Sequence, residues 1–302
     1  MTGILAEMPD IRRIEVGLKL REAKVHNGIL YNIEAWSNVS DKDMDRLGQV
    51  DTAALRAIMG GGHSKCPQAF YFLEFGTLMV KHTVMIRRLM YHYNIVRRDN
   101  CETIRKIYLK QIECPSKGDW ITLVRNDFTF MEEDFSEALI NIQSMSKEQY
   151  NKHIKGKVSK AAFKEYIYLK EKCEKKLKYM KYTKFAIQPY LTSKKLSMEE
   201  KKLLFSLRSK CYPAKMNSRK QFKGNTQCSL KCRTDETQDH IFEHCDPIRT
   251  KIGHNIKLSE IYGTLDDQIR VVRTLLEIDR MRKTLKDKIL PGGSVARTHV
   301  DT

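Results

Sequence analysis

The chain has 302 residues, 41% of them hydrophobic, which is enough to bury one large core or two to three small ones. Charged residues make up 30% of the sequence, and the formal net charge is +18 at pH 7. A positive surplus of this size favours a polyanionic partner, and we expect nucleic acid, RNA or DNA, rather than a membrane. The alternative is that the charge only keeps a basic protein in solution.

The sequence has no stretch approaching the roughly 18 to 20 apolar residues of a membrane span. Residues 1–9 lack the basic and apolar regions of a signal peptide. We therefore expect an intracellular protein, nuclear or cytoplasmic and not secreted. In a reducing compartment its eight cysteines should be thiols or metal ligands rather than disulfides.

Helical periodicity dominates the sequence and strand-like alternation is scarce, so we predict a mainly α fold. Ser40 and Asp43 stand in capping-box positions, and Gly76 and the glycines at 60–62 mark helix ends. Asp119 is placed to cap the helix that carries Trp120, which we expect to anchor the core. In the first half, helices are predicted over 10–35, from after Ser40 to Ile58, and over 66–75, 79–98, 101–113, 119–130 and 133–144. The apolar stripe after Ser40 is predicted to be Met44, Leu47, Val50, Ala54 and Ile58.

Two helices are predicted in the second half, each with its own start signal. Ser197 and Glu200 form a capping box for a helix over 198–210, and Thr264 with Asp267 caps a last helix. The last helix runs to about residue 290, with the predicted stripe Ile269, Val272, Leu276, Met281 and Leu285.

Positive charge is concentrated between residues 151 and 223, where 22 lysines and arginines stand against five glutamates and no aspartate, a net charge of +17. The rest of the chain is therefore close to neutral, and we predict a basic helical segment that contacts phosphates. The candidate nucleic-acid-binding residues are Lys155, Lys157, Lys160, Lys175, Lys176, Lys178, Lys181, Lys215, Arg219, Lys220 and Lys223.

Aromatic residues are interleaved with these lysines and fit two interpretations. Their ring faces suit bases, as in proteins that bind single strands, or they form the buried stripe of a solvated helix. We favour the buried stripe for the aromatics and phosphate contact for the charge. The aromatic positions are Phe163, Tyr166, Tyr168, Tyr179, Tyr182, Phe185 and Tyr190.

The most specific chemical pattern is a cluster of three cysteines and a histidine, Cys228, Cys232, His240 and Cys245. Three thiolates and one imidazole are the ligand set of a tetrahedral structural Zn²⁺ site, so we predict one structural zinc ion. His240 and Cys245 are five residues apart, so a short helix must tighten or end between them for both to reach the metal. His244 is a rival ligand, and we prefer Cys245 because a thiolate binds zinc more tightly.

Other polar groups do not form a catalytic set. Asp266 and Asp267 open a helix, where acidic residues are ordinary partners of the helix dipole. Ser64, in a glycine-rich turn, lacks an accompanying acid and base. Glu34 and Trp36 fit a packing and hydrogen-bonding role. We therefore predict no catalytic residues and expect a chain that is not an enzyme.

Several short motifs follow one another in a definite order: Tyr31–Trp36, His63–Lys65 with Pro67, Phe72–Gly76, Arg87–Leu89, Lys117–Trp120, Pro213–Lys215 and Thr237–Glu243. With the spacing of the cysteine and histidine cluster, this order resembles the region after the reverse transcriptase palm in non-LTR retrotransposon polyproteins. The resemblance covers roughly residues 10–285. It implies a helical thumb, with helices from 10 to 60 gripping a template–primer duplex, and a zinc knuckle whose ligands match Cys228, Cys232, His240 and Cys245.

The resemblance implies five segments: thumb-like helices (1–62), a helical linker (63–150), the basic helical segment (151–223), a CCHC zinc knuckle (224–250), and a C-terminal helix with a polar tail (251–302). The family's catalytic palm would precede Met1, so we expect a non-catalytic, nucleic-acid-binding fragment. Two alternatives are the C-terminal part of an active reverse transcriptase whose palm is encoded elsewhere, and a zinc-dependent protein-interaction module.

Overall fold

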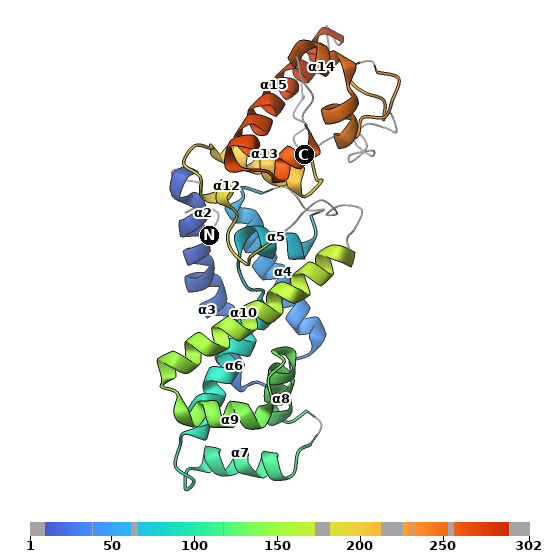
Figure 1. Ribbon diagram of the computed structural model, residues 1–302. Helices are drawn as coiled ribbons and strands as arrows, with labels where there is room; N and C mark the ends of the chain where they lie inside the picture. Colours follow the sequence, from blue (N-terminus) through green and yellow to red (C-terminus); the bar gives the residue numbers. More distant parts are fainter. Residues whose placement is uncertain are drawn as a thin grey trace, which may run out of the picture. The chain divides into compact units, whose positions relative to one another are not determined.

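The computed structural model describes residues 10–37, 39–61, 66–116, 118–172, 182–212, 226–230, 232–252 and 257–289, and these are mainly helical (Figure 1). The predicted α class is therefore confirmed. The described residues pair as β structure at one isolated bridge, between Gln227 and Asp235. They fall into two compact units: the first contains the described residues up to Lys194, and the second those from Lys195 onward.

The first unit is a helical bundle. In chain order it contains α2 (Asp10–Leu20), η1 (Arg21–His26), α3 (Asn27–Ile29), η2 (Ile33–Ala35), α4 (Asp41–Ile58), α5 (Gln68–Phe75), α6 (Val80–Val96), α7 (Thr103–Glu113), α8 (Trp120–Phe130), α9 (Phe135–Ser144), α10 (Lys147–Lys172) and α12 (Pro189–Thr192). The predicted helices agree with these bounds to within a few residues. The helix predicted over 10–35 differs inside, because η1 is π-helical and the regular helix ends at Ile29.

Local signals set most of the helix ends. The hydroxyl of Ser40 accepts a hydrogen bond from the amide of Asp43 at 3.2 Å, as its capping position predicts. Gly76 ends α5 with a φ of 56°, and a Cβ there would lie 2.2 Å from the carbonyl carbon of Ala186, so only glycine fits. Asp119 precedes α8 as expected, but its carboxylate accepts from the amide of Ser116, not from the helix.

Helix α10 crosses α5 and α6 and supplies the central apolar stripe of the first unit (Figure 1). Its buried side chains recur at every fourth residue, at Tyr150, Ile154, Val158, Ala162 and Tyr166. The first three pack in a core cluster with Leu89, Trp120 and Phe128. Trp120 is the predicted anchor: it is buried, and its Nε1 donates to the carbonyl of Glu34 at 2.7 Å.

The predicted stripe of α4 is wrong at Val50, whose side chain is 49% exposed. The buried position beside it belongs to Asp51, which is fully enclosed. Its carboxylate accepts two hydrogen bonds from Arg21 at 2.6 Å and contacts His26 Nε2 at 2.9 Å. Arg21 and His26 are five residues apart, and the π-helical turn of η1 brings both to Asp51, since its repeat is i to i+5.

The second unit contains α13 (Met198–Arg208), η4 (His240–His244), α14 (Asp246–Ile252), η5 (Leu258–Tyr262) and α15 (Leu265–Ile289). Both predicted caps are present: Ser197 and Glu200 form a capping box, and Thr264 and Asp267 exchange hydrogen bonds. The buried stripe of α15 differs from the prediction at two positions, since Leu275 and Ile278 are buried whereas Leu276 and Met281 are half-buried. The predicted Leu285 lies outside the described side chains. A five-residue step from 276 to 281 leaves one helix face, because each residue turns the helix by about 100°.

Among the described residues, we find no helix with the length and hydrophobicity that a membrane crossing requires.

Candidate metal centre and basic surface

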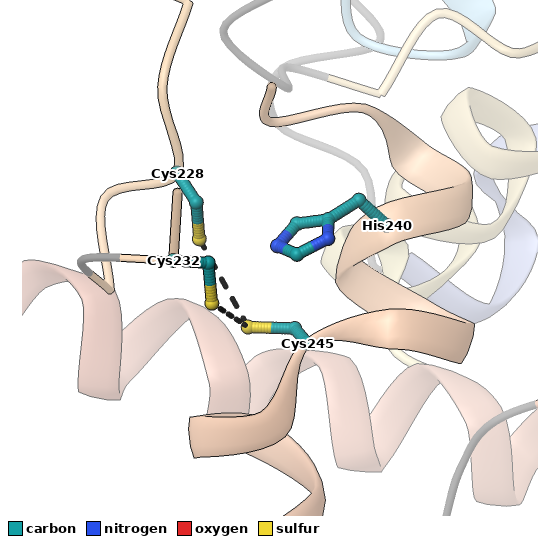
Figure 2. A group of neighbouring side chains, drawn as sticks. All are labelled: Cys228, Cys232, His240 and Cys245. Carbon is teal, nitrogen blue, oxygen red and sulfur yellow. Dashed lines mark hydrogen bonds between the residues drawn. The ribbon is translucent and has the colours of Figure 1, made fainter. Parts of the chain in front are cut away.

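The first two cysteines of the cluster lie on a tight loop closed by two short backbone segments. The amide of Cys228 donates to the carbonyl of Thr234 at 2.9 Å, and the amide of Glu236 donates to that of Thr226 at 2.6 Å. This pairing returns the chain so that Cys228 and Cys232 point to the same side (Figure 2). The amide of Leu230 also donates to Cys228 Sγ at 3.4 Å, a contact that favours the thiolate form.

The other two ligands come from a π-helical turn. Thr237 starts this segment by accepting the amide of His240 on its hydroxyl at 3.0 Å, and η4 then runs from His240 to His244. The backbone becomes extended at Cys245, with φ −84° and ψ 100°. The helix therefore ends between the two ligands, which is one of the two predicted arrangements. The other, a tighter helix, is not present: the turn is π-helical and so wider than an α-helix. A π turn brings residues five apart to one face, which is the spacing of His240 and Cys245.

The four side chains converge on one point (Figure 2). One ligand atom from each of Cys228, Cys232, His240 and Cys245 lies within 4.8 Å of all the others. Cys245 Sγ is 3.9 Å from the sulfur of Cys228 and 3.6 Å from that of Cys232. A tetrahedral zinc with Zn–S bonds of about 2.3 Å separates its sulfurs by about 3.8 Å. The predicted residues thus lie close enough to hold one metal ion.

The choice between Cys245 and His244 is decided by geometry. The His244 side chain is 70% exposed and lies 4.0 Å from a carboxylate oxygen of its neighbour Glu243. Cys245 is buried and its sulfur belongs to the cluster. The structure therefore brings together the predicted set of ligands with Cys245, and His244 lies outside it.

The thiols are too close together for all three to ionise without a cation. Hydrogen bonding from Cys245 lowers the pKa of Cys228 to about 5, and the same contact raises the pKa of Cys245. Burial raises the pKa of Cys232. One thiolate is thus favoured at the expense of its neighbours, because like charges at this distance repel. A divalent cation would remove this conflict by binding all three sulfurs as thiolates.

Two buried residues that were not predicted from the sequence, Glu236 and Arg282, hold the loop of the cluster in place. Buried Glu236 accepts the amide of Ser229, in the loop between the first two cysteines, at 2.8 Å. Its other oxygen pairs with the guanidinium of Arg282 on α15, which also donates to the hydroxyl of Tyr212. The signal for Arg282 was its spacing of four and seven residues from buried Ile278 and Leu275, which places it on their face.

Three of the eleven predicted nucleic-acid-binding residues, Lys155, Lys157 and Lys160, are described, and all lie on α10. The other eight, which are Lys175, Lys176, Lys178, Lys181, Lys215, Arg219, Lys220 and Lys223, lie outside the described residues. So do the motif residues His63, Ser64, Lys65 and Lys117 and the segment 213–215.

Helix α10 carries five lysines outside its buried stripe, which we call the lysine face: Lys152, Lys160 and Lys164 opposite the stripe, and Lys155 and Lys157 on its two flanks. Within the described part of the chain, only Lys164 of these has an acidic partner, Glu132 at 2.8 Å. Lys164 by this bond, and Lys160 and Lys157 through their charge, lower the pKa of Glu132. Four members, all but Lys155, line a groove of about 780 Å³ with Met131 and Met145, which we call the first groove.

Gly156 lies in the middle of α10 and lines the first groove, although a Cβ there would meet nothing within 4 Å. Internal packing therefore does not require glycine. We expect Gly156→Ala to raise the free energy of unfolding by about 0.5–1 kcal/mol, because alanine loses less backbone entropy in a helix. Urea denaturation followed by circular dichroism measures this, and a destabilised variant would contradict it.

The aromatic side chains of the basic segment divide between the two interpretations. Tyr166 and Tyr190 are fully buried, so the buried-stripe prediction is right for them. Phe163 and Phe185 are half-buried, Tyr168 is exposed, and Tyr179 lies outside the described residues. The hydroxyls of Tyr182 and Tyr190 both bond the carboxylate of buried Glu74 at 2.6 Å.

The chain thus combines two features with distinct chemistry. The cysteine and histidine cluster in the second unit offers four soft protein ligands, and the lysine face in the first unit offers ammonium groups that the described acidic residues leave largely unpaired. Asp266 and Asp267 lie at the start of α15, where Asp267 accepts hydrogen bonds from Thr264 and Asp266 pairs with Lys195.

Comparisons with protein-family models, with curated proteins and with solved structures found no match for this chain.

Proposed function

We propose that this chain is a non-catalytic, nucleic-acid-binding protein related to the thumb, linker and zinc knuckle of non-LTR retrotransposon reverse transcriptases. The lysine face of α10 is the observation that carries the binding part of this proposal. The order of the sequence motifs and the spacing of the four metal ligands support the relationship.

We assign zinc to the cluster because three thiolates and one imidazole are the ligands that zinc prefers. Four protein ligands complete a tetrahedron and leave no position for a substrate or a reactive water, which is the arrangement of a structural site. The ion would join the loop that carries Cys228 and Cys232 to the π turn that carries His240 and Cys245. Its role is thus to fold the segment around it.

Phosphate contact is the best use of the lysine face. Lys152, Lys155 and Lys160 are exposed, and none of them forms an ion pair with a described acidic residue. The face spans Lys152 to Lys164, which is about 18 Å along the helix axis at 1.5 Å per residue. Ammonium groups spread over this length and over the outward side of the helix are placed to meet several phosphates of one strand, and each contact releases a bound cation. Binding of this kind requires no particular base sequence.

The dependence of binding on salt tests the proposal. We expect a labelled single-stranded oligonucleotide to bind the full chain with an affinity that falls steeply as salt rises. Five phosphate contacts give a slope of log K against log salt of about −3.5, since each contributes about −0.7 on a single strand. Fluorescence anisotropy at a series of NaCl concentrations gives the slope. Absence of binding at low salt, or a slope near zero, would contradict the proposal.

A matched pair of variants separates the lysine face from net charge. Replacing Lys152, Lys157 and Lys160 with glutamine should flatten the slope by about two units, because three phosphate contacts are lost. Replacing Lys42, Lys106 and Lys110, which are exposed on α4 and α7, removes the same charge and should change the slope much less. Equal effects of the two triple variants would show that only net charge matters.

A further inference from the structure

We infer that a second groove of the first unit is a stacking site for an unpaired base of single-stranded RNA or DNA. This inference rests on the proposed function and adds a ligand class and a location to it. The groove has a volume of about 910 Å³ and lies between η1, the start of α6 and α10. Its lining includes Arg87, Lys155, Lys160, Phe163 and Phe185.

The basic side chains of this second groove are positioned for phosphates. Arg87 donates to the carbonyl of Leu30 and to the side-chain oxygen of Asn27, both at 2.8 Å. Both acceptors are neutral, so they fix the guanidinium without cancelling its charge. Lys155 and Lys160 have no acidic partner among the described residues, and Glu22 is the acidic residue in the lining. The groove therefore keeps a positive surplus.

Two phenylalanine rings give the groove an apolar platform beside these charges. The rings of Phe163 and Phe185 have centroids 6.0 Å apart, and the ring of Phe185 packs at 5.7 Å on that of Tyr166. Tyr166 is fully buried, and its hydroxyl accepts the amide of Met79 at 2.7 Å and contacts His82 Nδ1 at 3.0 Å, so the ring that supports the platform is held in place. Phe163 and Phe185 are only half-buried, which leaves part of their ring surface to the groove.

The combination selects single strands over duplexes. An aromatic ring can stack on any base whose face is free, and this is the common binding mode of proteins for single-stranded nucleic acid. In a duplex the base faces are already stacked on one another, so a duplex offers such a groove only phosphates. Stacking accepts any base, so we expect little sequence preference.

The second groove adjoins the lysine face, because Lys160 lines both the first and the second groove. Lys160 and Phe163 are three residues apart on α10, and side chains at this spacing are neighbours on a helix surface. A strand whose phosphates follow the lysine face would therefore bring a base to the ring of Phe163. The alternation of lysines and aromatic residues in the sequence therefore places the ammonium group of Lys160 beside the ring of Phe163 on one helix.

The test compares Phe163→Leu with Phe163→Tyr in the full chain, using oligothymidylate as the single strand and a mixed-sequence duplex as the second probe. Leucine keeps an apolar side chain for packing but removes the ring, whereas tyrosine keeps the ring. We expect Phe163→Leu to weaken single-strand binding by about 5- to 150-fold, the range for loss of one stacked base. Its salt slope and its affinity for the duplex should stay unchanged, and Phe163→Tyr should bind as the wild type does.

The outcomes distinguish this inference from the function on which it rests. If wild-type chain binds neither probe, the proposed function fails. If the wild type binds with a steep salt slope and Phe163→Leu binds both probes equally well, the stacking site is wrong and the phosphate surface stands. If Phe163→Leu loses affinity for both probes alike, the ring acts through packing of α10 and the stacking site is likewise wrong.

Discussion

Cys232→Ser is expected to reduce the zinc content of the purified chain from about one equivalent to a small fraction of it. A structural zinc contributes about 10–16 kcal/mol of binding free energy through its complete ligand set, and serine is a poor ligand beside a thiolate. Elemental analysis by mass spectrometry measures the metal directly. Wild-type protein with less than about half an equivalent would contradict the four-ligand site.

Loss of the metal should also unfold the segment around it. Hydrogen exchange in Cys232→Ser should become fast from Thr226 to Thr250, because the bound ion would join the loop to the π turn through these four ligands. The helices of the first unit should keep their protection. Two controls match the change: Cys101→Ser removes an exposed thiol, and His244→Ala removes the rival histidine. A loss of zinc in His244→Ala would show that the ligand set is wrong, and a loss of protection throughout would contradict an independent segment.

Asp51→Asn is expected to lower the free energy of unfolding of the first unit by about 3–5 kcal/mol, because it leaves the charge of Arg21 buried without its partner. The Arg21 and Asp51 side chains are 1% and 0% exposed, so water cannot solvate the guanidinium of Arg21 once the carboxylate is lost. Chemical denaturation measures the change. Glu15→Gln is the control, since Glu15 pairs with Lys19 on the surface and its replacement should leave the free energy of unfolding nearly unchanged.

The same carboxylate gives a pH dependence whose sign follows from its partners. Burial alone would raise the pKa of Asp51, but hydrogen bonds from His26 and Arg21 hold it below its usual value. The folded pKa is thus lower than the unfolded one, so this stabilisation is present above the unfolded pKa and is lost as pH falls through the folded one. Wild-type stability should therefore fall below about pH 4, and Asp51→Asn should lack this part of the fall. An equal acid-induced loss in both proteins would contradict the assignment.

Asp127 shows what happens to a buried aspartate with fewer donors. It pairs with Arg88 at 2.7 Å, no described histidine bonds to it, and burial raises its pKa to about 6. The two buried pairs therefore depend on pH with opposite signs, since the contribution of Asp127 to stability falls as pH rises from the ordinary aspartate pKa toward 6. Asp51 differs from Asp127 in having His26 as a third donor and Arg21 at 2.6 Å on both oxygens.

The helices were predictable because their signals are local. The caps at Ser40, Ser197 and Thr264 and the end at Gly76 depend on residues within one turn, and the structure confirms each of them. The inward faces were less predictable, because an apolar stripe says nothing of buried charge. Asp51 is buried only because Arg21, thirty residues earlier, meets it. Counting apolar residues therefore placed Val50 inside instead.

The candidate site divides in the same way. Residue type and spacing were enough to predict Cys228, Cys232, His240 and Cys245 as neighbours. The π turn was not predictable, because a helix of either width satisfies the same apolar pattern. Glu236 and Arg282 meet across 46 residues, and their pairing depends on how α15 packs. The grooves beside α10 are likewise formed by helices distant in the sequence. The sequence therefore indicated a basic surface but not the grooves in it.

Photochemical crosslinking of a bromouridine-containing single strand to the full chain, followed by identification of the modified peptides, tests the central claim most directly. The claim is that nucleic acid lies along α10. We predict crosslinks within α10, Lys147–Lys172, with Phe163 or its immediate neighbours among them, and their loss when Lys152, Lys157 and Lys160 are replaced. Crosslinks confined to other elements, such as α7, or none at low salt, would contradict it.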